Sequence, residues 1–186
     1  MPLSILPWPS LRWTLPSEPR PQHPLPSSIT RSLVPSGLDR KLELLTALPT
    51  SPSTASHPPI FFLHGGFGGA FVWIEWMTFF QQHGYACYAV SLRGHGESWH
   101  PSFWRMTWAT GLKDLAEDVK CVWEEVLRRE QKRTQLDDDE SEEPHQALPV
   151  LVGHSSGGGL AQYVLSEGYL RAEALVLCGA IPGTGG

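Results

Sequence analysis

Residues Gly153-His154-Ser155-Ser156-Gly157 follow an apolar run at 149–152 and precede a helix-like run that begins at Gly158. The pattern is G-x-S-x-G between a strand and a helix. It is typical of a nucleophilic serine, because a tight turn at this place projects the hydroxyl into a cleft. The flanking glycines permit the turn, since a side chain at either position would collide with the neighbouring strand or helix. A helix that begins there directs unpaired N–H groups towards developing negative charge. We therefore predict that Ser155 is a nucleophile.

Strands and helices are expected to alternate along the chain. Short apolar runs predict strands, and apolar residues at helical spacing predict helices. The expected strands lie at 42–48, 60–63, 85–92, 149–152 and 174–178, and the expected helices at 70–83, 112–133 and 156–167. This order predicts the α/β class, with a mostly parallel sheet and helices on both of its faces. The run at 174–178 would leave an apolar edge strand that a partner could cover.

A second glycine-rich segment, His64-Gly65-Gly66-Phe67-Gly68-Gly69, follows the strand expected at 60–63. Its backbone can approach a ligand closely, so one of its N–H groups and that of Ser156 are expected to form an oxyanion hole. Gly66 is the first candidate for this donor, and Phe67 is the alternative. His64 is either a general base or, the interpretation that we favour, a structural residue that anchors the turn.

The third motif is Ser91-Leu92-Arg93-Gly94-His95-Gly96-Glu97-Ser98, which by itself predicts a polar turn. The three motifs together, over about 60–180, resemble the α/β-hydrolase superfamily, in particular serine hydrolases of the AB hydrolase-1 type. In that family a strand with His-Gly is followed by Asp-x-Arg-Gly-His-Gly-x-Ser and then by Gly-x-Ser-x-Gly. Ser91 stands where the family pattern has Asp.

The resemblance implies that Ser155 is the nucleophile and that the backbone N–H groups of Gly66 and Ser156 form the oxyanion hole. A serine nucleophile implies a small-molecule substrate with an ester, thioester, lipid or peptide-like acyl group. No cofactor and no metal are implied. The rival hypothesis is a non-catalytic member of the same fold that binds a ligand or a partner.

The usual partners of such a serine are absent after Ser155. In the family an acid and then a histidine follow the nucleophile, but residues 156–186 contain no Asp and no His. The acids that do follow, Glu167 and Glu173, lie near the end of the expected helix and before the next expected strand. Three upstream histidines are an alternative source of the base: His95, His100 and His145. We therefore expect an N-terminal portion of the fold, truncated before the catalytic acid, the histidine and the cap, and nearly inert as it stands.

Composition divides the chain into two parts. Residues 1–36 are rich in Pro and Ser and are expected to form a disordered arm, because repeated proline removes backbone donors and blocks helices. Residues 37–186 are expected to form the partial α/β-hydrolase domain. The acidic segment at 135–146 is expected to be a solvated loop inserted in this domain, and a metal or basic-partner site is the alternative.

The remaining features limit partners and compartment. A net charge of -5 argues against nucleic-acid binding, which needs a basic surface, and no apolar run is long enough to span a membrane. Three separated cysteines in apolar surroundings predict buried free thiols in the cytoplasm, although import into an organelle through the N-terminal arm is an alternative. An aromatic group is expected either to line a substrate cleft or to pack against the next helix; it consists of Trp99, Phe103, Trp104 and Trp108.

Overall fold

The structure of the protein is a computed structural model that describes residues 24–37, 39–49, 57–137 and 147–182. Its elements are β1 (Ile29–Pro35), β2 (Lys41–Ala47), β3 (Ile60–Leu63), the 3-10 helix η1 (Ala70–Trp73), α1 (Ile74–Gln82), β4 (Cys87–Val90), α2 (Phe103–Trp108), α3 (Leu112–Asp137), β5 (Val150–His154), α4 (Ser156–Ser166) and β6 (Leu175–Cys178). The strands form one sheet in the order β1-β2-β4-β3-β5-β6. β3 is therefore central, and every one of the five strands expected from the sequence is present.

The sheet is parallel on the side that carries the serine motif. β4, β3, β5 and β6 run parallel, whereas β1 and β2 pair antiparallel with each other and β2 pairs antiparallel with β4. Because the carboxyl ends of parallel strands meet at one edge of the sheet, the loops after β3, β4 and β5 converge there. These loops carry the three motifs that the sequence singles out.

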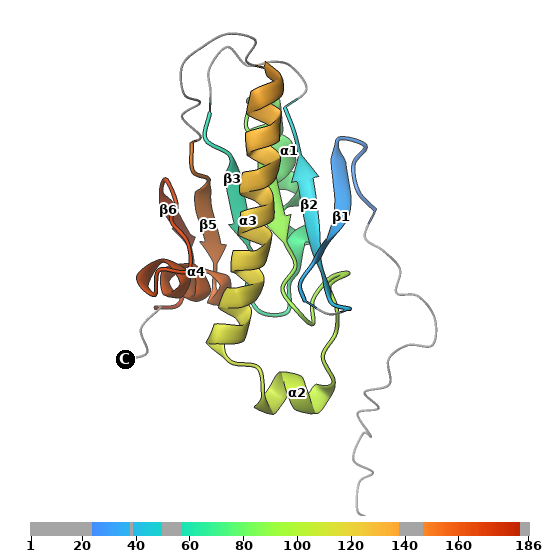
Figure 1. Cartoon of the computed structure of the whole chain (residues 1–186), viewed down its shortest axis with the longest axis vertical. Coiled ribbons are helices and arrows are strands. Elements are labelled where there is room, and N and C mark those ends of the chain that lie inside the picture. Colours follow the sequence, from blue (N-terminus) through green and yellow to red (C-terminus); the bar gives the residue numbers. More distant parts are fainter. Residues whose placement is uncertain (1–23, 38, 50–56, 138–146, 183–186) are drawn as a thin grey trace, which may run out of the picture.

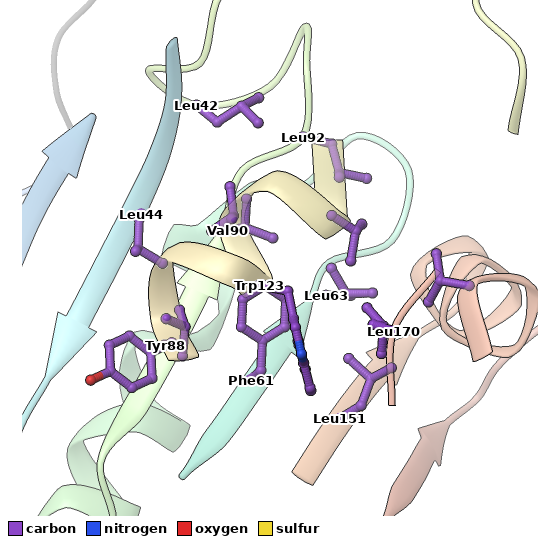
Figure 2. Close-up of a cluster of buried hydrophobic side chains, with 14 of the residues drawn as sticks. Leu42, Leu44, Phe61, Leu63, Tyr88, Val90, Leu92, Trp123, Leu151 and Leu170 are labelled. Carbon is purple, nitrogen blue, oxygen red and sulfur yellow. The ribbon is translucent and has the colours of Figure 1, made fainter. Parts of the chain in front are cut away.

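Helices cover both faces of the sheet, as Figure 1 shows. One hydrophobic cluster joins the sheet to α3 and α4, and Phe61 packs edge-on against Trp123 within it (Figure 2). A second cluster joins the other face to η1 and α1, with Phe62 against Trp73. Successive residues of β3 thus point to opposite faces, and both faces are buried, which explains its uninterrupted apolar sequence. The predicted fold class is confirmed.

The N-terminal boundary predicted from composition is wrong. Residues 29–35, placed in a disordered arm at 1–36, form strand β1 and pair with β2 along its whole length. Between Pro26 and Pro35 the chain has no proline, so the backbone donors needed for pairing are intact. Ile29 and Val34 are buried in this strand. The rest of the predicted arm, residues 1–23, lies outside the described residues.

Several boundaries differ from the expected ones. The expected helix at 70–83 is divided into η1 and α1, and α3 extends through residues 135–137, which were expected to belong to the acidic loop. The rest of that loop, 138–146, lies outside the described residues. The short helix α2 was not expected; the side chain of Ser102 accepts a hydrogen bond from Arg105 N at its start. No helix in the described ranges is long and apolar enough to cross a membrane.

Candidate active site

Ser155 lies at the junction of β5 and α4 in a backbone conformation that is rare for a residue with a side chain. Its φ is 53° and its ψ is -123°. A positive φ costs a non-glycine residue energy and is retained only where the surrounding structure fixes it. Here Ser155 N donates to Cys178 O, and Ser155 O accepts from Ile181 N. The residues that follow β6 therefore hold the turn from one side.

Glycines at the turn allow two strands and a helix to meet without space for a side chain. A Cβ on Gly157 would lie 2.2 Å from His64 O, and a Cβ on Gly153 would lie 2.7 Å from the Cα of Gly158. A Cβ on Gly65 would lie 2.9 Å from the Cβ of Ser155. The close approach of α4 to the end of β3 thus depends on these glycines. It brings the loop after β3 next to Ser155.

The helix α4 begins directly after the serine. Gly158 N and Gly159 N both donate to Ser155 O, while the N–H of Ser156 lies in the first turn of the helix. The first N–H groups of a helix lack partners within the helix and carry its positive partial charge. An oxygen that becomes negative beside Ser155 would meet this end of α4.

Gly66 lies close to Ser156, as the oxyanion-hole prediction requires. Its N–H, however, donates to Ser156 Oγ, with 2.7 Å between the two atoms. The predicted donor therefore has a partner within the protein, which sequence reasoning did not anticipate. Phe67, the alternative donor, has a φ of 63° and a fully exposed side chain, so the loop turns outward immediately after Gly66.

His64 has the structural role that the sequence suggested. Its Nε2 accepts from Leu92 N at 3.0 Å, so its Nδ1 carries the proton and donates to Gly65 O at 2.7 Å. Burial lowers the pKa of His64 to about 4, and the ring stays neutral at physiological pH. Both ring nitrogens are engaged in tying the end of β4 to the loop after β3, and neither is available as a general base.

His95 lies beside His64, with 4.8 Å between the ring centroids. Its Nδ1 donates to Arg93 O at 3.0 Å, and its Nε2 forms no hydrogen bond within the described part of the chain. Arg93 is held in turn by Asp118 of α3, through Nε at 2.6 Å and a second nitrogen at 2.8 Å. A two-bonded ion pair of this kind fixes the direction of the loop. It places His95 on the wall of the cavity described below.

The other upstream histidines and the downstream acids are less favourably placed. His100 is partly exposed in the loop after β4, and His145 lies outside the described residues. Glu167 caps the far end of α4, 12 residues beyond Ser155, which at a rise of about 1.5 Å per residue is roughly 18 Å away. Glu173 N donates to Pro149 O, at the opposite end of β5 from the serine. Neither acid is brought to the site.

Ser91 stands where the family pattern has Asp, and its hydroxyl is hydrogen-bonded to a carboxylate from another strand. Ser91 Oγ donates to Glu43 Oε2 at 2.6 Å, and Glu97 N donates to the same oxygen at 3.0 Å. Glu43 is buried on β2, and its other oxygen accepts from Arg31 of β1 at 2.6 Å. Sequence reasoning missed Glu43. The signal was a single acid in an otherwise apolar run, since a buried charge requires partners.

A cavity of about 350 Å³ opens at the same edge of the sheet. Gly66, Ser156 and His95 contribute to its wall, together with apolar side chains of α2, α3 and α4. The structure thus brings together both predicted oxyanion-hole residues and one of the upstream histidines.

In the aromatic group, Trp104 and Trp108 of α2 are mostly exposed, whereas Trp99 packs against the core.

Comparisons with known proteins show which family the chain resembles in sequence. A family model described as alpha/beta hydrolase family matches residues 60–186. The non-heme chloroperoxidase of Streptomyces lividans is 33% identical to this chain over 127 residues, which are 67% of the chain and 37% of that protein. Protein ABHD8 of Homo sapiens is 31% identical over 108 residues, which are 58% of the chain and 20% of that protein.

A solved structure with a similar fold is the esterase from Exiguobacterium antarcticum. Its TM-score is 0.56 at 21% identity, and the match covers 81% of this chain and 46% of that one. At this identity the match demonstrates a shared fold. The chain spans less than half the length of the chloroperoxidase and about a fifth of the length of ABHD8.

Proposed function

The chain belongs to the α/β-hydrolase family, and we propose that its Ser155 is the nucleophile of a serine hydrolase that acts on an ester or a related acyl substrate. The observation that carries the proposal is the backbone of Ser155, with φ 53° and ψ -123° between a parallel strand and a helix start. Such a conformation costs roughly 1–3 kcal/mol and clusters at active sites. In the proposed role, this conformation presents the hydroxyl at the edge of the sheet.

In the proposed reaction, Ser155 Oγ forms a bond to the acyl carbon while its proton passes to a base. The carbonyl electron pair moves onto oxygen, and the N–H groups of Ser156 and Gly66 stabilise the resulting anion. Collapse of this intermediate breaks the bond to the alcohol, which takes up the proton, and water then hydrolyses the acyl-enzyme. Because Gly66 N donates to Ser156 Oγ in the structure, the substrate oxygen would replace that hydroxyl.

Residues 156–186 do not provide the histidine base that follows the nucleophile in the family order. No histidine follows Ser155 in the sequence. Loss of the base from a catalytic serine costs on the order of a million-fold in rate. A preparation of residues 1–186 alone is therefore expected to react slowly, with its residual reactivity supplied by the oxyanion hole and the orientation of Ser155.

The second candidate is a binding protein with the same fold and no catalysis. One observation favours it: Gly66 N–H already has an acceptor within the protein. A protein of this kind would retain its cavity and bind an acyl compound without forming a covalent intermediate. The test below separates it from the hydrolase.

We also propose a cytoplasmic location. Cys87 is buried, Cys121 and Cys178 are partly exposed, and none of the three forms a disulfide. Free thiols persist where the compartment is reducing.

The proposed partner is the small acyl substrate itself. The apolar residues of β6, Leu175, Val176 and Leu177, are partly exposed, so a partner chain at this edge is the remaining part of the proposal.

A fluorophosphonate probe tests the catalytic proposal. The native chain should be labelled slowly and at Ser155, as mapped by mass spectrometry of the digested protein. Labelling should disappear in Ser155→Ala and after denaturation. It should persist in the matched control Ser166→Ala, since Ser166 is an exposed serine on the same helix. An absence of labelling at native Ser155 would exclude an activated nucleophile and favour the binding protein.

A further inference from the structure

Helix α2 projects at one end of the domain, as Figure 1 shows, and presents two tryptophans to the solvent. Trp104 is 71% exposed and Trp108 is 77% exposed, and neither of them lines the cavity. Because the two residues are four positions apart in a helix, their side chains lie on the same face of it. This pair is called the tryptophan face below. Large apolar groups that are exposed together mark an interaction surface, whereas single ones are ordinary.

Contacts outside the tryptophan face hold α2 in place. Met106, on the opposite side of the helix, lines the cavity, and a Cβ on Gly94 would lie 3.4 Å from its Cε. The guanidinium carbon of Arg105 lies over the ring of Trp99, 5.9 Å from the centroid. At the start of the helix, the side chain of Ser102 accepts a hydrogen bond from the backbone. Residues other than the two tryptophans thus anchor α2 to the domain.

The segment that carries the tryptophan face is positively charged, although the whole chain has a net charge of -5. Residues 98–113 contain Arg105 and Lys113, both of them exposed, and no Asp or Glu. The first acid that follows is Asp114, whose carboxylate is paired with Arg93 at 3.0 Å. The tryptophans are therefore accompanied by exposed cations and by no exposed anion from their own segment.

This combination of side chains fits the surface of a lipid bilayer. Tryptophan is enriched at the boundary between membrane and water, because its ring is apolar and its N–H is polar. Basic side chains are attracted to the anionic lipids of the cytoplasmic leaflet. An apolar groove on a protein would accept the indoles, but it would offer no counter-charge to the cations beside them. The charge of the segment therefore favours an anionic membrane over an apolar protein groove.

We propose that the tryptophan face docks on an anionic lipid bilayer. The two indoles enter the interface, and Arg105 and Lys113 lie at the level of the lipid headgroups. With six residues, α2 is too short to cross the bilayer and rests on its surface. Because α2 follows the loop after β4, docking brings the edge of the sheet that carries Ser155 towards the membrane. The inference does not depend on Ser155 being a nucleophile.

Flotation of residues 1–186 with lipid vesicles tests the inference. Vesicles of phosphatidylcholine and phosphatidylserine should bind the protein, and its tryptophan fluorescence should shift to shorter wavelengths as the indoles leave water. The double variant Trp104→Ala, Trp108→Ala should bind at least tenfold more weakly, because burial of each indole is favourable. The matched control Trp76→Ala removes a half-exposed tryptophan of α1 and should bind like the unsubstituted chain. Circular dichroism establishes that each variant is folded.

A second pair of variants tests the contribution of charge. Lys113→Gln, at the start of α3, should weaken binding to the anionic vesicles by about fivefold at low salt. This difference should shrink at high salt, which screens exposed charges. The control Lys132→Gln removes an exposed lysine at the other end of α3 and should have no effect. Vesicles of phosphatidylcholine alone should bind the unsubstituted chain more weakly than the anionic vesicles do.

Three results would overturn the inference. The first is that the anionic vesicles do not bind the chain. The second is that the double tryptophan variant binds as tightly as the unsubstituted chain, since another surface would then meet the lipid. The third is a dimer in sedimentation velocity without lipid that the double variant dissociates, together with no binding to vesicles, since the tryptophan face would then join two copies of the chain.

Discussion

Replacement of Gly157 by alanine should disrupt the junction between α4 and the end of β3. The new Cβ would lie 2.2 Å from His64 O and 2.8 Å from both His64 C and Leu63 O. All three atoms are backbone, and β3 is held between β4 and β5 in the centre of the sheet. No side-chain rotation can relieve the overlap, so the start of α4 must move away from the strand.

The expected cost follows from this geometry. Inserting a methyl group into a packed site costs typically 1–3 kcal/mol, and rigid surroundings place Gly157→Ala at about 3 kcal/mol. For a chain of this size that corresponds to a fall in the midpoint of thermal unfolding of about 6–12 °C. Urea unfolding followed by circular dichroism measures the free energy directly.

Gly111→Ala is the matched control. The nearest atom to its new Cβ is Asp114 Oδ2 at 4.0 Å, so the free energy of unfolding should change by less than about 0.5 kcal/mol. The reasoning would be refuted if Gly157→Ala unfolded at the same urea concentration as this control, because the backbone contact at the turn would then be tolerated.

Three further predictions concern charge, pH and the oxyanion hole. Glu43→Gln removes the carboxylate charge that accepts hydrogen bonds from Arg31 Nε, Ser91 Oγ and Glu97 N, and should lower the free energy of unfolding measured in urea by about 2 kcal/mol, whereas an unchanged midpoint would show that this charge is dispensable. Because burial lowers the pKa of His64 from 6.5 to about 4, the unfolded chain binds more protons than the folded chain between these values. The free energy of unfolding should therefore fall as the pH falls below about 6.5, by up to about 1.4 kcal/mol per pH unit, and urea titrations of His64→Asn should lack that part of the slope. Ser156→Ala removes the hydroxyl that accepts the hydrogen bond from Gly66 N. One neutral hydrogen bond is worth about 1 kcal/mol, so labelling by the fluorophosphonate should become about fivefold faster. Slower labelling would instead show that the Ser156 hydroxyl assists the reaction as a donor.

The parts of the fold that the sequence predicted are those set by local pattern. The apolar run 60–63 became β3 with the expected bounds, since a strand buried on both faces needs no alternation. The role of His64 was also predictable, because the sequence places it at the end of that strand. The boundary at 1–36 failed for the opposite reason. Composition was averaged over the whole arm, whereas β1, Ile29–Pro35, depends on the proline-free stretch 27–34 between Pro26 and Pro35.

What the sequence could not predict are contacts between residues far apart in the chain. The bond from Gly66 N to Ser156 Oγ joins residues 90 positions apart, and nothing in either motif specifies it. Exposure of Trp104 and Trp108 depends on how α2 projects from the domain, as Figure 1 shows, and periodicity in a six-residue helix carries no such information. The cavity requires three helices and the segments after β3, β4 and β6 at once.

The hairpin of β1 and β2 helps to hold the loop after β4, because Glu43 of β2 accepts hydrogen bonds from Ser91 Oγ and Glu97 N. The matched family region begins at residue 60, but the charge that holds the turn after β4 is supplied from residue 43 and is balanced from residue 31. A fragment trimmed to the matched region would keep Ser155 and all three motifs, yet it would leave Ser91 and the N–H of Glu97 without an acceptor. The shortest piece of this protein that can preserve the loop carrying His95 therefore begins before β1.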